Sequence, residues 1–226
     1  MNLLTITIED KKTIEGRVNY ACINALSDVL NKQVEKDRIS ICHTQFFVEL
    51  KDRGWQEASR YIQNDPSSPI IERWKAIKHA QAYITSDVLL IPCHFPGHWA
   101  LAIRVILPTG KHSLYVLDSL GREATETSFL KVRDYLKNTP IIGNKIKLKT
   151  HTIRTQRSDE CGARMAKYMT NICTDWTETC TSGFSSWLGR LLNTERNDKR
   201  NLNRTSRDIL KGILNRATEK YKYNKL

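Results

Sequence analysis

The middle of the chain alternates between apolar runs and turn residues, a pattern that predicts a small β-sheet. Four strands are expected, at Val88–Ile91, Trp99–Ile106, Ser113–Leu117 and Lys145–Thr155. The residues Pro92–Gly97 are expected to form a turn-rich loop after the first strand. Pro108–Gly110 is typical of a hairpin turn, so the second and third strands should be antiparallel neighbours.

Helical patterns surround this sheet. Apolar residues recur at helical spacing in several segments, which predicts helices at Val18–Leu30, Trp55–Tyr61, Pro69–Ala80, Phe129–Leu136 and Arg207–Ala217. Ile39–Leu50 is rich in β-branched and aromatic residues, of which we expect three to be buried, namely Phe46, Phe47 and Leu50. Met1–Asp10 alternates like a short strand. Helices on either side of a small sheet in the chain predict an α+β fold, with a small central mixed sheet flanked by helices.

Size and composition are those of one soluble globular domain. The 226 residues are 40% hydrophobic and 27% charged, so we expect a single domain over residues 1–226 and a monomer. No apolar run reaches the roughly 18 residues that a transmembrane helix needs. The N-terminus lacks the basic segment and long apolar segment of a signal peptide. These features predict an intracellular protein, nuclear or cytoplasmic, without a membrane partner.

The cysteine spacing argues against disulfide bonds and metal sites. The six cysteines are scattered and form no CxxC pair; they are Cys22, Cys42, Cys93, Cys161, Cys173 and Cys180. Such spacing is typical of free thiols in a reducing compartment. Cys93, His94 and His98 lie close together in the chain, but no second ligand pair stands at zinc-finger spacing. We therefore do not expect a metal site.

Positive charge is concentrated near the end of the chain. The net charge is +12, and residues 190–226 hold eleven basic against four acidic side chains. This basic segment, a predicted helix and tail, admits two interpretations. It could contact nucleic acid or act in nuclear targeting, or it could be the solvated face of a terminal helix. The apolar residues within Arg207–Ala217 favour the second interpretation for the helix itself.

Cys161 lies where a loop is expected to become a helix. Ser158 or Asp159 can cap the helix, and good helix formers follow from Ala163 onward. The field of a helix N-terminus favours a thiolate over a thiol, which would make Cys161 a nucleophile. Gln156, five residues upstream, could donate to an oxyanion. The alternative is that Cys161 is a small apolar residue of a buried helix.

A cysteine nucleophile needs a base and a group that orients it, and the predicted hairpin offers both. His98 directly precedes the second strand, and Asp118 directly follows the third. In an antiparallel hairpin these two positions lie at the same end of the sheet. His98 could then act as the base and Asp118 as its orienting carboxylate. The alternative for Asp118 is an ordinary turn aspartate.

These residues stand within longer motifs that resemble a known family. The motifs are Gly97-His98-Trp99-Ala100-Leu101, Tyr115-Val116-Leu117-Asp118-Ser119-Leu120, and Gln156 followed by Cys161-Gly162. They are similar to the His-Trp, Asp-Ser and Gln…Cys-Gly signatures of the ubiquitin-like-protein (SUMO) proteases, cysteine peptidases distantly related to the adenovirus protease. The resemblance covers about residues 18–173. Where that family has Trp-Leu-Asn-Asp before its first long helix, this chain has Arg17-Val18-Asn19-Tyr20.

The resemblance implies an activity and roles for individual residues. It implies a papain-like, adenovirus-protease-like architecture and hydrolysis of the peptide or isopeptide bond after a Gly-Gly C-terminus of a ubiquitin-like modifier, without metal or cofactor. Cys161, His98, Asp118 and Gln156 would be catalytic, and Trp99 and Gly162 would contact the substrate, with the Trp99 indole covering the two glycines. Two alternatives remain. One is a protein acyltransferase or acetyltransferase with the same constellation, and the other is a nucleic-acid-binding module on a degenerate protease fold.

Overall fold

The computed structural model describes most of the predicted sheet and the helices beside it. The described residues are 18–34, 38–53, 84–120, 122–137, 139, 146–152, 160–176, 183–190, 207–208, 210–212 and 215. Several sequence predictions lie outside them, including the strand at Met1–Asp10, the helices at Trp55–Tyr61 and Pro69–Ala80, and the position of Gln156. The described residues of the predicted helix Arg207–Ala217 are helical.

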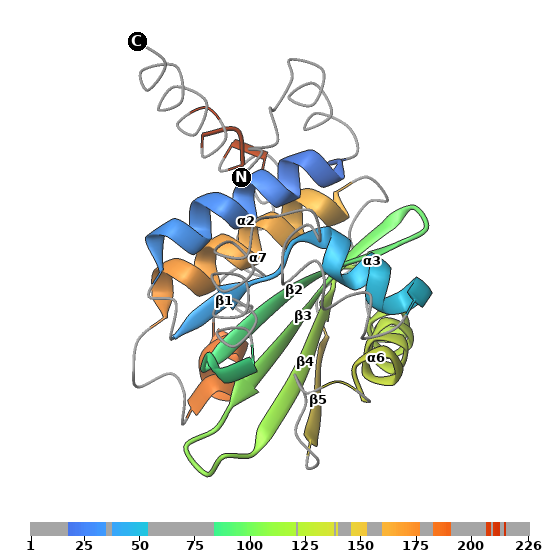
Figure 1. Cartoon of the computed structure of the whole chain (residues 1–226), viewed down its shortest axis with the longest axis vertical. Coiled ribbons are helices and arrows are strands. Elements are labelled where there is room, and N and C mark those ends of the chain that lie inside the picture. Colours follow the sequence, from blue (N-terminus) through green and yellow to red (C-terminus); the bar gives the residue numbers. More distant parts are fainter. Residues whose placement is uncertain are drawn as a thin grey trace, which may run out of the picture.

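A five-stranded mixed sheet forms the centre of the described structure (Figure 1). Its strands follow the order of the chain: β1 (Ile39–Ile41), β2 (Val88–Phe95), β3 (His98–Ile106), β4 (His112–Asp118) and β5 (Ile146–Thr152). β2, β3 and β4 are antiparallel, whereas β1 joins β2 and β5 joins β4 in parallel. The predicted hairpin between the second and third expected strands is therefore confirmed as β3 and β4.

The loop predicted at Pro92–Gly97 is wrong for most of its length. β2 continues to Phe95, and Pro92 pairs with Leu101 of β3. Proline is tolerated there because β1 pairs only with Val88–Leu90, so that edge of β2 needs no backbone donor at Pro92. The connection shrinks to a tight turn, in which Gly97 has a φ of 71° that favours glycine. His98 consequently begins β3 directly after a rigid turn.

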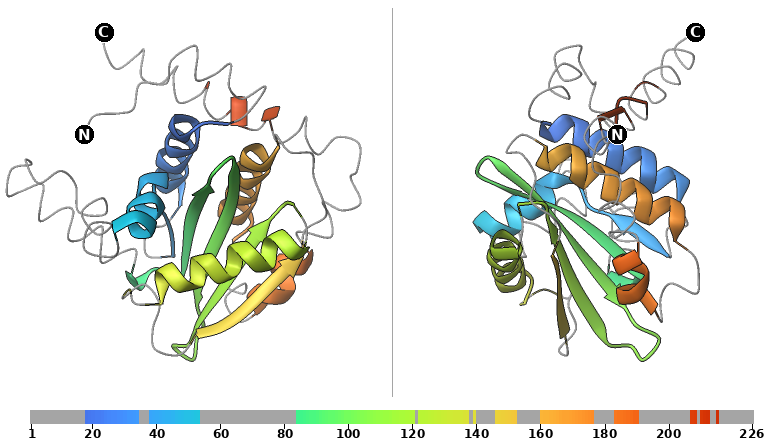
Figure 2. Two further views of the ribbon diagram at one scale, coloured as in Figure 1. Left: turned by 90° about the vertical axis from the view of Figure 1, so that its right-hand side faces the viewer. Right: turned by 180° about the vertical axis from the view of Figure 1, so that it is seen from behind.

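Helices cover both faces of the sheet (Figure 2). α2 (Tyr20–Gln33) and α7 (Cys161–Asp175) lie side by side on one face. α3 (Thr44–Arg53) and α6 (Arg122–Leu136) pack on the other, and α6 lies in front of the sheet in the left view of Figure 2. The α+β class with a small mixed sheet flanked by helices is confirmed.

The central strands β2, β3 and β4 are buried on both faces, which explains why they are largely apolar runs. Along β3, Leu101 and Ile103 belong to the core beneath α2 and α7, whereas Ala100 and Ala102 belong to the core beneath α3 and α6. The second core also contains the three side chains predicted to be buried, Phe46, Phe47 and Leu50. They lie on α3, because Ile39–Leu50 divides into β1 and a helix.

Two further observations concern the described residues alone. The five described cysteines, Cys22, Cys42, Cys93, Cys161 and Cys173, are free thiols. Among the described helices, none has the length and apolar character required to cross a membrane.

Candidate active site

Cys161 is the first residue of α7, where a loop was predicted to become a helix. Its side chain is buried against the sheet, with 6% of the residue exposed. The predicted caps at Ser158 and Asp159 lie outside the described residues, and Glu160 occupies the cap position without a side-chain capping bond. Because the first N–H groups of a helix have no partner within the helix, the start of α7 presents donors beside the thiol.

The hairpin places His98 and Asp118 in direct contact. His98 is the first residue of β3 and Asp118 the last of β4, so the antiparallel pairing puts both at one end of the sheet. Nε2 of His98 lies 2.8 Å from Oδ2 of Asp118. The His98 side chain is 14% exposed, and that of Asp118 is fully buried.

The Asp118 carboxylate is held by donors from three separate elements. Besides His98, the Ser128 hydroxyl of α6 donates to Oδ2 at 2.6 Å, and the backbone N–H of Leu120 donates to Oδ1 at 2.9 Å. Burial raises the pKa of Asp118, but these hydrogen bonds and the charge of His98 outweigh it and leave the pKa below its ordinary value. Asp118 is therefore an anion at neutral pH.

The second nitrogen of the His98 ring is available to the thiol. Nδ1 is buried and forms no well-aligned hydrogen bond with a described residue. Burial lowers the pKa of His98, but the hydrogen bond to Asp118 and the nearby Cys161 thiol raise it overall to about 9. With Nε2 bonded to Asp118, Nδ1 is the nitrogen left to exchange a proton with Cys161.

The thiol of Cys161 is correspondingly acidic. Burial raises its pKa, but interaction with His98 and the backbone N–H groups of Trp99 and Gly162 lowers the pKa below its ordinary value. A raised histidine pKa beside a lowered cysteine pKa describes a thiolate–imidazolium pair. This pair is the form in which cysteine is a strong nucleophile near neutral pH.

Gly162 leaves room for the indole of Trp99. A Cβ atom at Gly162 would lie 2.8 Å from the Val18 Cβ, closer than real Cβ contacts come, and 3.1 Å from the Trp99 Cδ1, a tight contact. The indole is 5% exposed and donates from Nε1 to the Val18 carbonyl at 3.1 Å. The structure thus places Trp99 and Gly162 beside the thiol as tightly packed neighbours, and their contact with substrate stays a prediction.

An aromatic group from α2 and β2 covers the outer side of Trp99. The ring centroids of Tyr20 and His94 lie 5.3 Å and 4.6 Å from that of Trp99. The Tyr20 hydroxyl is hydrogen bonded to Nδ1 of His94. Burial, Lys51 and His98 lower the pKa of His94, which keeps its ring neutral and able to accept that bond. Tyr20 is 41% exposed, so it forms the solvent-facing side of this group.

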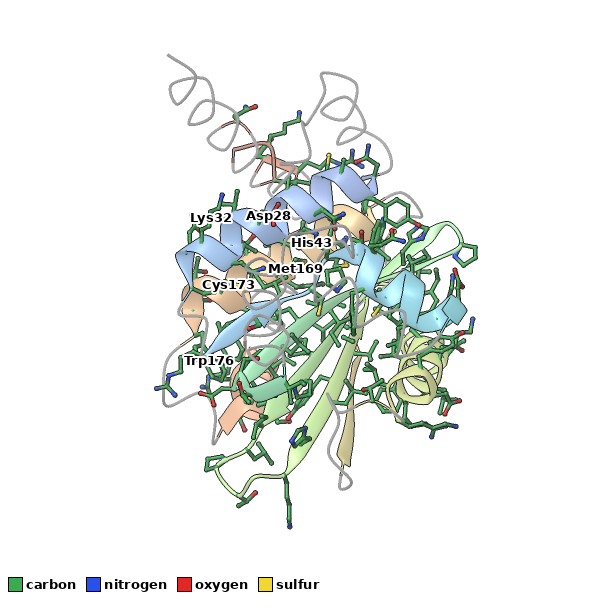
Figure 3. The ribbon with its side chains drawn as sticks, in the orientation of Figure 1. Asp28, Lys32, His43, Met169, Cys173 and Trp176 are labelled. Atoms are coloured by element: carbon green, nitrogen blue, oxygen red, sulfur yellow. The ribbon has the colours of Figure 1, made fainter. Side chains whose placement is uncertain are left out.

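A second histidine–aspartate pair lies away from this cluster. Nε2 of His43, which precedes α3, is 2.8 Å from Oδ1 of Asp28 on α2. Figure 3 labels both residues near α2. Their side chains are 39% and 19% exposed, and neither Asp28 nor His43 is among the groups that shift the pKa of Cys161. Geometry alone therefore does not distinguish a candidate catalytic pair from a surface ion pair.

Three of the four predicted catalytic residues are brought together, and the fourth, Gln156, lies outside the described residues. Sequence reasoning missed Ser128, although a signal existed. Ser128 is a polar residue on the buried face that α6 forms with Phe129, Val132 and Leu136. It also missed the Tyr20–His94 contact, which joins residues 74 positions apart. Within the described part of the chain, no group of three or more His, Cys, Asp or Glu side chains could hold a metal ion.

Comparisons with known proteins find the same fold in proteases. Neither a family model nor a curated protein sequence matches the chain. Among solved structures, a de-sumoylating protease aligns over 96% of this chain and 90% of its own, with a TM-score of 0.62 and 14% identity. The C-terminal Ulp1 protease domain, solved with Smt3, the yeast orthologue of SUMO, aligns over 76% and 73%, with a TM-score of 0.54 and 20% identity.

A third similar structure has no stated activity. It is the central domain of the uncharacterized Lpg1148 protein from Legionella pneumophila, with a TM-score of 0.50 and 14% identity over 88% of this chain and 99% of its own. At these identities the likeness is one of fold. The SUMO-protease-like architecture implied by the sequence motifs is thereby confirmed.

Proposed function

We propose that this protein is a cysteine protease that cleaves after the Gly-Gly-type C-terminus of a ubiquitin-like modifier, either to mature the modifier or to release it from a conjugate. The observation that carries the proposal is the contact of Asp118 with His98 beside the acidic thiol of Cys161. Nucleophile, base and orienting carboxylate come from α7, β3 and β4, so rigid elements hold all three.

The first half of the reaction is acyl transfer to sulfur. Nδ1 of His98 carries the proton of the Cys161 thiol, and the thiolate attacks the carbonyl carbon after the second glycine, forming a C–S bond. The oxyanion is stabilised by the N–H of Cys161 at the start of α7 and, in this proposal, by the amide of Gln156. His98 then protonates the leaving amine, the C–N bond breaks, and a thioester remains.

The second half is hydrolysis of that thioester. His98, now neutral, takes a proton from a water molecule as it attacks the thioester carbonyl. The C–S bond breaks, the modifier leaves with a free carboxyl group that releases the second water proton to solvent, and the Cys161 thiolate and His98 imidazolium are restored. Asp118 stabilises the imidazolium each time it forms and keeps one ring orientation throughout.

The choice of substrate rests on the sequence motifs and on the fold. His98-Trp99, Asp118-Ser119 and Cys161-Gly162 resemble the motifs of SUMO proteases, and two solved structures with this fold are a de-sumoylating protease and a protease domain bound to Smt3. Glycine has no side chain, so a Gly-Gly segment suits a site where Trp99 is packed closely beside the nucleophile. We therefore propose a SUMO-like modifier as the first partner to test.

The test is covalent capture of the thiol by modifiers that carry a C-terminal electrophile. A panel of recombinant SUMO, ubiquitin and related modifiers, each ending in a propargylamide, would be incubated with the full chain and with Cys161→Ala. We expect one member to form an adduct at Cys161, located by peptide mass spectrometry, and none to label the alanine variant. If no modifier in the panel labels Cys161 while a small alkylating agent does, the result would contradict a ubiquitin-like modifier as the substrate. It would still support Cys161 as a nucleophile.

Transfer of an acyl group to a protein is the competing outcome for the same residues. Incubation with acetyl-coenzyme A and candidate protein acceptors, followed by mass spectrometry, would detect it. If the acceptors are acetylated only when Cys161 is present, and no modifier amide is hydrolysed, the protease proposal is wrong and the protein is an acyltransferase.

A further inference from the structure

Ser128 is a polar residue on an otherwise apolar helix face. It is 6% exposed, and its neighbours along the buried side of α6 are Phe129, Val132 and Leu136. A buried hydroxyl costs stability unless it is hydrogen bonded, and an alanine would form the helix better. The bond that Ser128 makes is the 2.6 Å contact with Oδ2 of Asp118. Ser128 thus connects α6 to the candidate active site through Asp118.

Oδ2 of Asp118 receives two donors from opposite parts of the fold. Nε2 of His98 approaches at 2.8 Å from β3 and the Ser128 hydroxyl at 2.6 Å from α6, while Oδ1 accepts the N–H of Leu120 at 2.9 Å. Donors on both oxygens, from three elements, define the plane of the carboxylate. Asp118 is fully buried, so no solvent is at hand to replace a lost donor.

We propose that Ser128 is a positioning residue that fixes the Asp118 carboxylate, and through it the imidazole of His98, toward the thiol of Cys161. The hydroxyl itself touches neither the thiol nor the scissile bond. It acts by preventing rotation of the carboxylate about its bond to Cβ, because rotation would turn Oδ2 away from Nε2 of His98. Loss of that contact removes the group that stabilises the imidazolium, and the thiolate loses its cation.

This inference rests on the proposed thiolate chemistry but not on the modifier as substrate. Its readout is therefore the rate of Cys161 alkylation by iodoacetamide as a function of pH, which requires no substrate. Among the described residues, the titratable groups that face His98 are Asp118 from β4, Cys161 from α7 and His94 from β2, and Lys51 of α3 acts on His94. None of these residues is altered in the variants below, so a shift of the profile reports a change in how they are arranged.

The experiment compares Ser128→Ala with a matched serine outside the site. Ser27 of α2 is a fully buried helical serine whose hydroxyl donates to the Ile23 carbonyl at 3.0 Å, so Ser27→Ala removes the same group without touching Asp118. We expect Ser128→Ala to move the midpoint of the alkylation profile upward by roughly half a pH unit, a roughly threefold drop in thiolate on the acid side. Ser27→Ala should leave the midpoint in place.

A purely structural role of Ser128 predicts a different result. Ser128→Ala and Ser27→Ala would then both have a lower melting temperature, and the midpoint of the Cys161 alkylation profile would be unchanged in both. This outcome would overturn the proposal. A midpoint shifted to lower pH would also overturn it, because it would mean that Ser128 weakens the Asp118–His98 bond. If Ser128→Ala does not fold, Ser128→Cys fills the same space with a weak S–H donor and should show the upward shift in smaller measure.

Discussion

The protein contains two histidine–aspartate pairs of the same length in very different surroundings. Both His98–Asp118 and His43–Asp28 have an Nε2 to carboxylate distance of 2.8 Å. Asp118 is fully buried and the His98 side chain is 14% exposed, whereas the Asp28 and His43 side chains are 19% and 39% exposed. Distance alone cannot therefore indicate function.

The difference lies in what surrounds each pair. In the buried pair, the carboxylate has further donors from Ser128 and Leu120, the imidazole adjoins a thiol, and together Asp118 and Cys161 raise the His98 pKa to about 9. A partly exposed pair such as His43–Asp28 is screened by water and contributes little to stability or reactivity. A candidate catalytic pair is recognised by burial, by the fixed carboxylate and by the nucleophile beside it.

The two histidine–aspartate pairs should differ most in their effect on the hydrolysis rate when the imidazole of each is removed. His98→Ala should reduce hydrolysis of a modifier C-terminal amide by about 10³- to 10⁴-fold, because it removes both the base and the cation of the thiolate. His43→Ala should stay within about twofold of the unaltered protein. Steady-state rates at fixed pH test both variants. Equal losses of hydrolysis rate in the two variants would contradict a catalytic role that belongs to His98 and not to His43.

The next contrast replaces each carboxylate by an amide of the same shape. Asp118→Asn should lower kcat by about 10²- to 10³-fold with little change in KM, since the imidazolium loses its counter-charge and its fixed orientation. Asp28→Asn is the matched control and should leave kcat within about twofold. Circular dichroism of both variants checks that they are folded. A mild effect of Asp118→Asn would show that the carboxylate is a turn residue without a role in catalysis.

A smaller effect is expected when the packing beside the buried pair is disturbed. Gly162→Ala places a Cβ 2.8 Å from the Val18 Cβ and 3.1 Å from the Trp99 Cδ1. We expect it to lower the free energy of unfolding by about 1–3 kcal/mol and to shift Trp99. Gly189→Ala, where a Cβ would meet no atom within 4 Å, is the control. Urea denaturation measures the free energy of unfolding of both variants, which should be lower for Gly162→Ala than for Gly189→Ala. Equal values would mean that Trp99 does not pack tightly against Gly162.

The smallest effect is expected at the aromatic group outside Trp99. Tyr20→Phe keeps the ring beside Trp99 and removes only the hydroxyl that bonds to His94. Because this bond touches neither the thiol nor Asp118, kcat should fall by no more than about threefold, and stability by about 1 kcal/mol. Kinetics and thermal melting would measure both. A loss as large as that in Asp118→Asn would assign the hydroxyl a role in catalysis.

The sequence predicts the central hairpin and the candidate site residues that it carries for the same reason. A hairpin has few possible registers, so its apolar runs and the turn at Pro108–Gly110 predict that His98 and Asp118 lie at one end of the sheet, as the pairing of β3 with β4 confirms. The helix start predicts the position of Cys161 equally well, because a thiol at the first residue of α7 requires only local structure.

What the sequence does not predict depends on contacts between distant segments. Proline signals a turn locally, but Pro92 lies in β2 because the short β1 leaves that edge free. The start of α6 is missed because residues 122–128 are polar apart from Ala124 and carry no apolar repeat. Ser128 holds Asp118 only because the helix packs across the end of β4, which no local pattern encodes.

The most direct test of the central claim compares two thiols on one helix. Cys161 and Cys173 both lie on α7, but burial raises the pKa of Cys173 to about 12 while His98 lowers that of Cys161. Iodoacetamide labelling between pH 5 and pH 9, followed by peptide mass spectrometry, measures both rates. We expect Cys161 to react at least about a hundredfold faster at pH 7, with a midpoint below its ordinary pKa that rises in His98→Ala. Equal rates, or a Cys161 midpoint unaffected by His98→Ala, would contradict the thiolate–imidazolium pair.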